Sequence, residues 1–177
     1  MIFPRSRDDG NAGRNIGWRV GIVLLTGMLG LSGCASPPRI PANVILRDAH
    51  NNGYTLAFDS RSETLATGGS EGRIRLWHLP DGKELSGWKA HTDSLQGLVF
   101  LDHDRELLSA AYDGTLARWT RDGTLLKRLN TPAPVTGMAA DEAANLVVTG
   151  HSDGHVRLWR LADLALARDL HPHRGAV

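Results

Sequence analysis

Short runs of alternating apolar and polar residues, each ending in a tryptophan, are the most regular feature of this chain. In Arg73–Trp77 and His155–Trp159 the residues one and three positions before the tryptophan are apolar, and those two and four positions before it are polar. Thr115–Trp119 is the corresponding segment between them. A period of two puts neighbouring side chains on opposite faces of a β-strand. The pattern therefore predicts three strands, each with one buried face and one polar face.

A tight turn precedes each of these strands. Glu71-Gly72, Asp113-Gly114 and Asp153-Gly154 stand immediately before them, and glycine readily adopts the positive φ that a two-residue hairpin requires. The three tryptophans follow one another at intervals of 42 and 40 residues. Repeats of about 40 to 45 residues with such a turn and tryptophan are typical of the four-stranded blades of a β-propeller.

The remaining strands are predicted from short apolar segments between turn residues. We expect three blades, at about residues 50–90, 91–130 and 131–172. The expected strands are Tyr54–Phe58, Thr64–Gly68, Ile74–His78, Glu84–Lys89, Leu95–Phe100, Glu106–Ala110, Leu116–Thr120, Leu125–Asn130, Val135–Ala140, Asn145–Gly150, Val156–Leu161 and Ala165–Leu170.

These repeats resemble those of the WD-repeat β-propeller family. In that family four side chains form a hydrogen-bonded tetrad: a histidine near the start of the repeat, a serine or threonine late in the second strand, the turn aspartate and the third-strand tryptophan. The resemblance implies these structural residues: His50, Thr67, Glu71 and Trp77 in the first repeat, His91, Ser109, Asp113 and Trp119 in the second, and Thr149, Asp153 and Trp159 in the third.

The match to the family pattern is complete only in the middle repeat. Glu71 replaces the turn aspartate of the first repeat, and the histidine position of the third falls at Thr131-Pro132, so we expect an incomplete tetrad there. The aspartate that usually follows the tryptophan is replaced in all three repeats, by His78, Thr120 and Arg160. The resemblance covers about residues 43–177 and implies an all-β, partial β-propeller of three four-stranded blades.

Both ends of the repeat region carry pieces of further repeats. Residues 44–50 align with the outer strand of a blade and the loop after it, which predicts a strand that closes a propeller ring. Residues 171–177 repeat the segment that begins at His91, which predicts the start of a fourth blade. Closed propellers typically have four to eight blades. Because three blades leave unpaired edges and uncovered faces, we expect a truncated propeller or one that closes by homo-oligomerisation.

The N-terminal residues have a different character. Four arginines precede an apolar stretch, Val20–Leu31, that is too short to span a bilayer and is typical of a secretory signal. Leu31-Ser32-Gly33-Cys34 resembles the lipobox of bacterial lipoproteins, which implies a signal peptide at 1–33, lipidation of Cys34, and a Pro-rich spacer at 34–42. An uncleaved anchor and a buried thiol are the alternatives. Ala35 resembles the outer-membrane sorting pattern, so we expect a periplasm-facing protein anchored in the bacterial cell envelope.

Composition excludes several classes of function. Without residues 1–33 the chain has 16 basic and 17 acidic side chains, so it lacks the basic surface that nucleic-acid binding requires. Arg73, Arg75 and Arg157 alternate along strands and predict a solvated face. Asp102 and Asp104 are expected in a turn rather than a catalytic pair, and the histidines lack ligand-spaced partners. We therefore expect no enzymatic activity, metal or cofactor.

The function expected from this pattern is protein binding by loops on a rigid scaffold. The positions immediately before the turn carboxylates, Ser70, Tyr112 and Ser152, are the candidate partner contacts, with Tyr112 favoured because aromatic residues dominate binding hot spots. Ordinary exposed turn residues are the alternative at these positions. Two other functions remain open: a docking or sensory part of a longer exported enzyme, such as a redox protein, and a non-functional remnant of a full propeller.

Overall fold

The computed structural model describes residues 46, 49–171, 175 and 177. The expected signal peptide, Cys34, the spacer and most of the expected closing strand at residues 44–50 lie outside these residues. All the described residues belong to one compact unit, Ser36–Val177.

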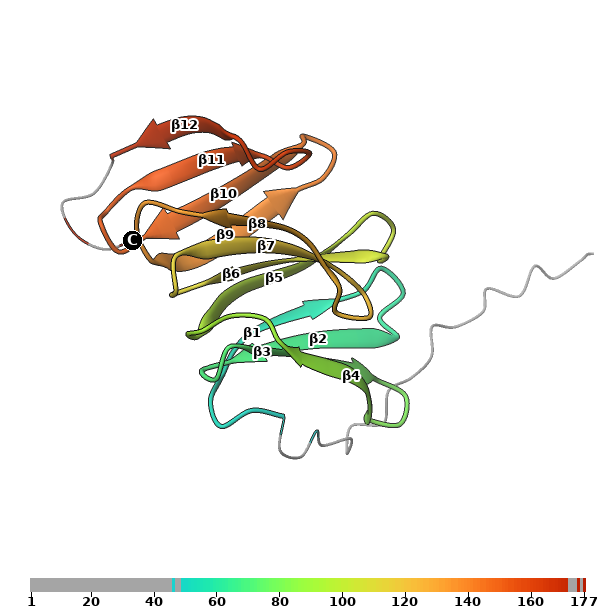
Figure 1. Ribbon diagram of the computed structural model, residues 1–177. Coiled ribbons are helices and arrows are strands. Elements are labelled where there is room, and N and C mark those ends of the chain that lie inside the picture. Colours follow the sequence, from blue (N-terminus) through green and yellow to red (C-terminus); the bar gives the residue numbers. More distant parts are fainter. Residues whose placement is uncertain (1–45, 47–48, 172–174, 176) are drawn as a thin grey trace, which may run out of the picture. The chain divides into compact units, whose positions relative to one another are not determined.

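The described residues form three antiparallel sheets of four strands, each a simple meander, so the expected all-β fold class of three four-stranded blades is confirmed (Figure 1). Every strand boundary agrees with its expected position to within one residue. The first sheet contains β1 (Gly53–Phe58), β2 (Thr64–Gly69), β3 (Arg73–His78) and β4 (Lys83–Lys89); the second contains β5 (Leu95–Leu101), β6 (Glu106–Ala111), β7 (Thr115–Thr120) and β8 (Leu125–Asn130); the third contains β9 (Val135–Asp141), β10 (Leu146–His151), β11 (Val156–Arg160) and β12 (Leu166–Leu170).

Glycine turns connect the second strand of each sheet to the third. Gly72, Gly114 and Gly154 have φ angles of 70°, 75° and 83°, in the left-handed region that a β-carbon disfavours. These turns set the register in which Leu65, Leu107 and Val147 lie opposite the three tryptophans. The local sequence of each turn thus fixes which strand residues face each other.

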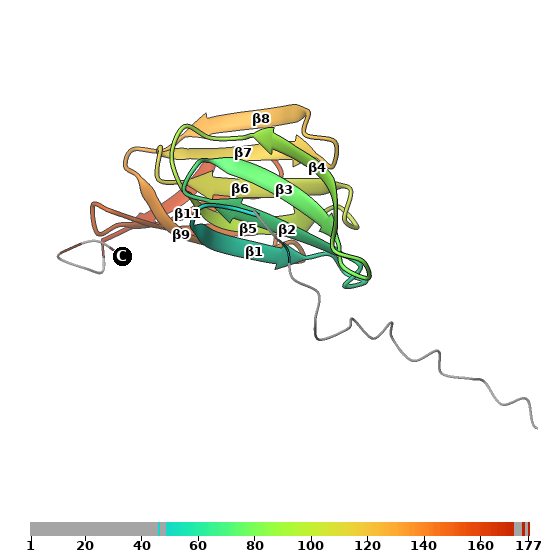
Figure 2. The same ribbon diagram turned by 90° about the horizontal axis from the view of Figure 1, so that it is seen from below.

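The three sheets stack through their faces, with the first strand of each sheet closest to its neighbour. Strand β5 contacts β1 on one side and β9 on the other (Figures 1 and 2). One buried cluster joins Ala66, Ile74 and Leu76 of the first sheet to Leu98 and Phe100 of the second. A second cluster joins the second sheet to the third through residues that include Leu108, Leu116, Val135 and Val147. The hydrophobic core therefore lies between the blades, as in a propeller.

Candidate protein-interaction site

The middle blade contains a fully connected set of buried polar side chains. His91 is 1% exposed, and its Nε2 lies 2.7 Å from Ser109 Oγ, while Trp119 Nε1 donates to the same hydroxyl at 2.8 Å. On the other side of the ring, His91 Nδ1 lies 3.2 Å from Asp113 Oδ2 and 2.8 Å from Thr115 Oγ1. The structure brings together all four residues that the family resemblance pointed to, and adds Thr115.

The Asp113 carboxylate holds two parts of the blade together. It accepts hydrogen bonds from the backbone N–H and hydroxyl of Thr92, and from the backbone N–H and hydroxyl of Thr115. Burial by itself would raise the pKa of Asp113, but the hydrogen bonds from His91, Thr115 and Thr92 outweigh it and hold the pKa well below its usual value. Asp113 therefore stays ionised and links the loop before β5 to the β6–β7 turn.

The first blade builds the same arrangement with glutamate. His50 Nε2 lies 2.8 Å from Thr67 Oγ1, to which Trp77 Nε1 also donates at 2.9 Å, and His50 Nδ1 pairs with Glu71 Oε1. The second carboxylate oxygen of Glu71, Oε2, is buried without a hydrogen-bond partner among the described residues. The longer side chain thus reaches the histidine but satisfies fewer of its own lone pairs than Asp113 does.

The third blade was expected to lack a tetrad histidine, and there the structure differs. His151, which is fully buried, places Nε2 at 2.7 Å from Thr149 Oγ1, and Trp159 Nε1 donates to the same hydroxyl at 2.8 Å. His151 Nδ1 lies 2.9 Å from the carbonyl oxygen of Ala133, beside the expected histidine position. The end of β10 thus supplies the imidazole that the start of the repeat lacks.

The sequence contains a signal for this change in the origin of the tetrad histidine. The usual spacing between the tryptophan and the start of the repeat does not identify His151, because His151 lies at the end of the second strand. His151 stands eight residues before its tryptophan, where the other two repeats carry Gly69 and Ala111. A β-carbon on Gly69 would lie 2.7 Å from the Cβ of His50, so a small residue is needed where the histidine comes from the repeat start. Where the start is Thr131-Pro132, the small position is free to carry the histidine itself.

Asp153 has a different partner from the one expected. Its carboxylate accepts two hydrogen bonds from Arg157, at 3.2 and 2.7 Å, and Arg157 Nε also donates to Asp169 at 3.2 Å. The Arg157 side chain is only 4% exposed, so the expected solvated strand face is wrong at this position. The hydrogen bonds from Arg157 lower the pKa of Asp153 to about 2 despite the opposing effect of burial.

The three candidate contact residues occupy equivalent places on one face, which we call the upper face and define by the β2–β3, β6–β7 and β10–β11 turns. The backbone N–H of Ser70, Tyr112 and Ser152 donates to the carbonyls of Asn52, Ser94 and Pro134, at 2.9, 2.9 and 3.0 Å respectively. Tyr112 is 42% exposed, and the two serines are partly exposed. The structure therefore holds three turn residues rigidly in equivalent positions and leaves one aromatic ring accessible.

The described acidic and histidine side chains outside the tetrads are paired locally or stand apart from one another. In residues 46, 49–171, 175 and 177 no group of three or more histidine, cysteine, aspartate or glutamate side chains is arranged to hold a metal ion. Asp102 and Asp104 lie in the turn between β5 and β6, where Asp102 pairs with Arg105 and Asp104 accepts from Ser60. No helix in this part of the chain is long and apolar enough to cross a membrane.

The stacked four-stranded meanders with a buried tryptophan–hydroxyl–imidazole set in each define a β-propeller segment. The family model "WD domain, G-beta repeat" matches residues 43–78, 82–120 and 123–160, and the chain therefore belongs to the WD40 repeat family. Two solved structures of computationally designed proteins are similar in fold. Ika4 has a TM-score of 0.63 and 28% identity over 73% of this chain and 79% of Ika4, and Ika8 has 0.59 and 28% over 71% and 38%.

Natural relatives are much longer proteins. Cilia- and flagella-associated protein 337 B of Tetrahymena thermophila is 30% identical over 129 residues, which are 71% of this chain and 10% of that protein. Meiotic fizzy-related protein 1 of Schizosaccharomyces pombe is 27% identical over 69% of this chain and 30% of its own length. The chain spans at most 30% of either protein, so the similarity identifies the repeat rather than a whole-protein activity.

Proposed function

We propose that this WD-repeat segment is a protein-interaction scaffold attached to the bacterial envelope through a lipid on Cys34, and that a partner protein binds its upper face. The observation that carries the proposal is the equivalent anchoring of Ser70, Tyr112 and Ser152 by one backbone hydrogen bond in each blade. Side chains on a preorganised backbone lose little conformational entropy when they bind. Tyr112 is the proposed anchor residue, because it combines exposure with a large amphipathic ring.

Site-specific photo-cross-linking in the native host tests the upper face. A photoreactive amino acid is placed in the full chain at Ser70, Tyr112 or Ser152, and at Asp122 as the control. Asp122 lies in the β7–β8 turn, at the opposite ends of the strands. We expect one partner of the same mass to be captured from all three upper positions and not from Asp122. Equal capture from Asp122, or none from the three upper positions, would contradict the proposal.

The lipid anchor is supported by the sequence features around Cys34, the single cysteine of the chain. In bacterial lipoproteins with such a lipobox the thiol receives a diacylglyceryl group and the new amino terminus is acylated. Each buried methylene contributes about 0.8 kcal/mol, and two acyl chains already suffice for stable anchoring. We propose that the mature protein begins at Cys34 and faces the periplasm from the outer membrane, with residues 34–42 as the spacer.

Replacing Cys34 by serine tests the anchor. A hydroxyl does not replace the thiol as acceptor, so the C34S protein should keep its signal peptide and take up no fatty acid. Metabolic labelling with an alkyne-bearing palmitate measures the attachment, and the mass of the amino-terminal peptide reports the cleavage. A labelled C34S protein would show that the lipid is attached elsewhere or that the signal has been misread.

A further inference from the structure

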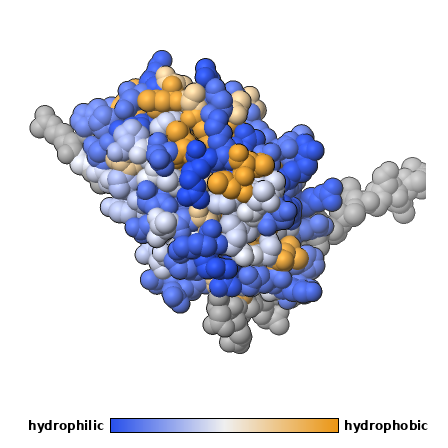
Figure 3. Space-filling view, in the orientation of Figure 1, coloured by the Kyte–Doolittle hydropathy of each residue, from blue (hydrophilic) through white to orange (hydrophobic). Residues whose placement is uncertain are grey.

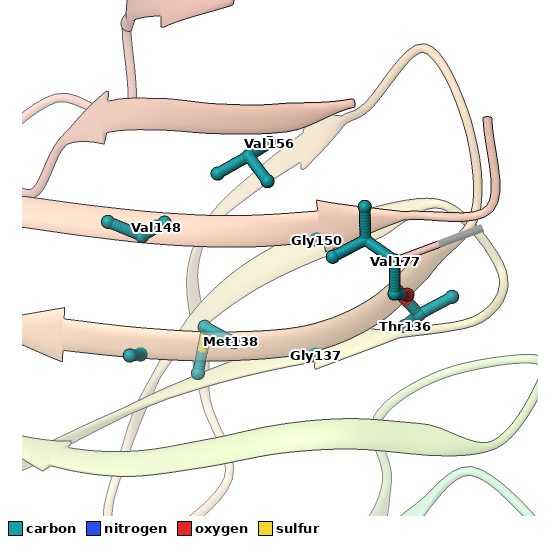
Figure 4. Close-up of a pocket in the computed structure, with 8 residues that line it drawn as sticks. Thr136, Gly137, Met138, Val148, Gly150, Val156 and Val177 are labelled. Atoms are coloured by element: carbon teal, nitrogen blue, oxygen red, sulfur yellow. The ribbon is translucent and has the colours of Figure 1, made fainter. Parts of the chain in front are cut away.

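In the part of the chain that the structure describes, two apolar faces at opposite ends of the stacked sheets are not covered by another sheet. The leading face consists of Tyr54, Leu56 and Phe58 on β1, which are 57%, 65% and 57% exposed. The trailing face consists of Gly137, Val148, Gly150 and Val156 on the third sheet, and together with Met138 and Val177 these residues line a hollow of about 270 Å³ (Figure 4). Figure 3 shows hydrophobic side chains gathered over the third sheet. Contiguous exposed apolar surface of this kind marks an interaction site.

The leading face repeats a surface that is buried inside the same chain. Leu56 and Leu98 lie opposite the tetrad hydroxyl residues of their blades, and Phe58 and Phe100 lie two positions further along the same strands. Leu98 and Phe100 are only 8% and 9% exposed, since they pack against the first sheet. At these two positions the residue types are identical in the two blades. The difference in exposure therefore arises because none of the sheets that the structure describes covers β1.

The trailing face is the other half of the same interface. Val156 corresponds to Ile74 and Leu116 of the earlier blades, which are completely buried by the sheet that follows each of them. Val156 and Val148 are partly exposed. The same pair of surfaces meets between the first and second sheets and again between the second and third. Among residues 46, 49–171, 175 and 177, no sheet covers the third copy of either surface.

One residue of the chain already occupies the end of the trailing face. Val177 N donates to the carbonyl of His151 at 3.1 Å, and its side chain lies over Gly150 (Figure 4). A β-carbon on Gly150 would lie 2.9 Å from Val177 Cγ1, just as a β-carbon on Gly68 would lie 2.9 Å from Leu95, the first residue of β5. The trailing face therefore accepts an apolar residue in the way that the first sheet accepts the strand of the next blade.

The interface between the second and third sheets shows which residues would face each other in a contact between two chains. Met138 of β9 packs directly onto Gly97 of β5, where a β-carbon would come within 2.6 Å of the methionine Cβ. Gly137 is the equivalent of Gly97 in the third sheet, and apart from its chain neighbours no described residue has an atom within 4 Å of its β-carbon position. Leu56 is the equivalent of Met138 in the first sheet. A leucine from a second chain thus fits the open position at Gly137.

We propose that the chain associates head to tail with a second copy of itself, the leading face of one copy packing on the trailing face of the next, with Leu56 seated on Gly137. The contact is heterologous, so it produces a ring if the rotation closes and an open chain if it does not. The proposal is independent of the upper face, because the turns that carry Ser70, Tyr112 and Ser152 are not part of either apolar face.

Charge substitutions on the two faces test the proposal in the full chain, purified in a mild non-ionic detergent. Leu56→Glu alters a side chain that is 65% exposed, and Gly137→Glu enters open space, so neither change should disturb the fold. Ala143→Glu, in the exposed β9–β10 turn, is the control for added charge. We expect light scattering to give the mass of at least about two chains for the native protein and for A143E, and of one chain for L56E and G137E.

A cross-link tests the register. In a Cys34→Ser background, a chain carrying Leu56→Cys is mixed with a chain carrying Gly137→Cys, and we expect a disulfide between the two chains that either chain alone forms at least about tenfold less. Circular dichroism establishes that each variant is folded. A native protein that is monomeric, an assembly that survives both glutamate variants, or a mixture without the cross-link would overturn the proposal and would mean that another molecule covers these faces.

Discussion

At the scale of single residues, the buried hydroxyl of each blade joins the second strand to the third and also binds an imidazole. Ser109 lies on β6, accepts from Trp119 on β7 and pairs with His91 from the loop before β5, and it also donates to the carbonyl of Ala117 at 3.3 Å. Thr67 and Thr149 bind the corresponding tryptophans in the other blades. A network in which every member is satisfied rigidifies a core, whereas an unpaired buried group costs free energy. In the middle blade these hydrogen bonds hold the second and third strands and the loop before the first strand in one arrangement.

Asp113→Ala should destabilise the protein more than Glu71→Ala. Removal of Asp113 leaves His91 Nδ1 with one partner fewer and frees the Thr92 and Thr115 groups, at a cost of about 1 to 3 kcal/mol. Glu71 already has one unpaired buried oxygen, so its loss removes an imperfect contact. Urea denaturation of the two full-chain variants measures the difference. Equal losses would show that the two carboxylates contribute alike and that the tetrad of the middle blade has no special weight.

At the scale of elements, the strands follow from alternation and the turns from glycine. The β2–β3 turn is the tightest case. Gly72 has a φ of 70°, and a β-carbon there would lie 2.3 Å from the carbonyl oxygen of His91. The glycine is therefore required twice, by its own backbone conformation and by the close approach of the segment that leads to the next blade.

Gly72→Ala should lower the free energy of unfolding by more than about 2 kcal/mol, because the left-handed conformation alone costs about 1 to 2 kcal/mol and the clash adds to it. Gly53→Ala is the matched control. Its β-carbon meets nothing within 4 Å, and the equivalent positions of the other blades carry Leu95 and Val135. Chemical denaturation should show little change for G53A. A small effect of G72A would mean that the turn relaxes and does not constrain the blade.

At the scale of the whole molecule, the same interface between blades is used repeatedly, and stability depends on how many of its copies are occupied. In repeat proteins each unit contacts only its neighbours, so an end without a neighbour contributes less. Within the described residues, the places without such a contact are the exposed Leu56 and Phe58 at one end and the partly exposed Val148 and Val156 at the other.

The melting temperature should consequently rise with protein concentration, because association favours the folded state by mass action. We expect an increase of a few degrees over a hundredfold range of concentration for the native chain and none for Leu56→Glu. Differential scanning fluorimetry in the same detergent measures both, with Ala143→Glu as the control. A melting temperature that is independent of concentration in the native chain would contradict head-to-tail association.

Local sequence patterns are enough to predict the strands, the turns, the blade period and the tetrads of the first two blades. These features depend on short-range chemistry: side-chain alternation, positive φ at glycine, and a tryptophan at constant distance from its turn. Cys34 and the residues before it are likewise interpreted from sequence alone, and their lipidation stays a prediction.

Packing between distant segments, in contrast, establishes which histidine completes the third blade, which partner Asp153 takes, and which apolar faces are covered. His151 and Arg157 belong to local patterns that predict an ordinary turn flank and a solvated strand, yet both are buried once the sheets pack. Leu56 and Leu98 are the same residue at the same position of their blades, and differ only in whether another sheet lies against them. Burial is a property of contacts between segments far apart in the chain, which local patterns do not contain.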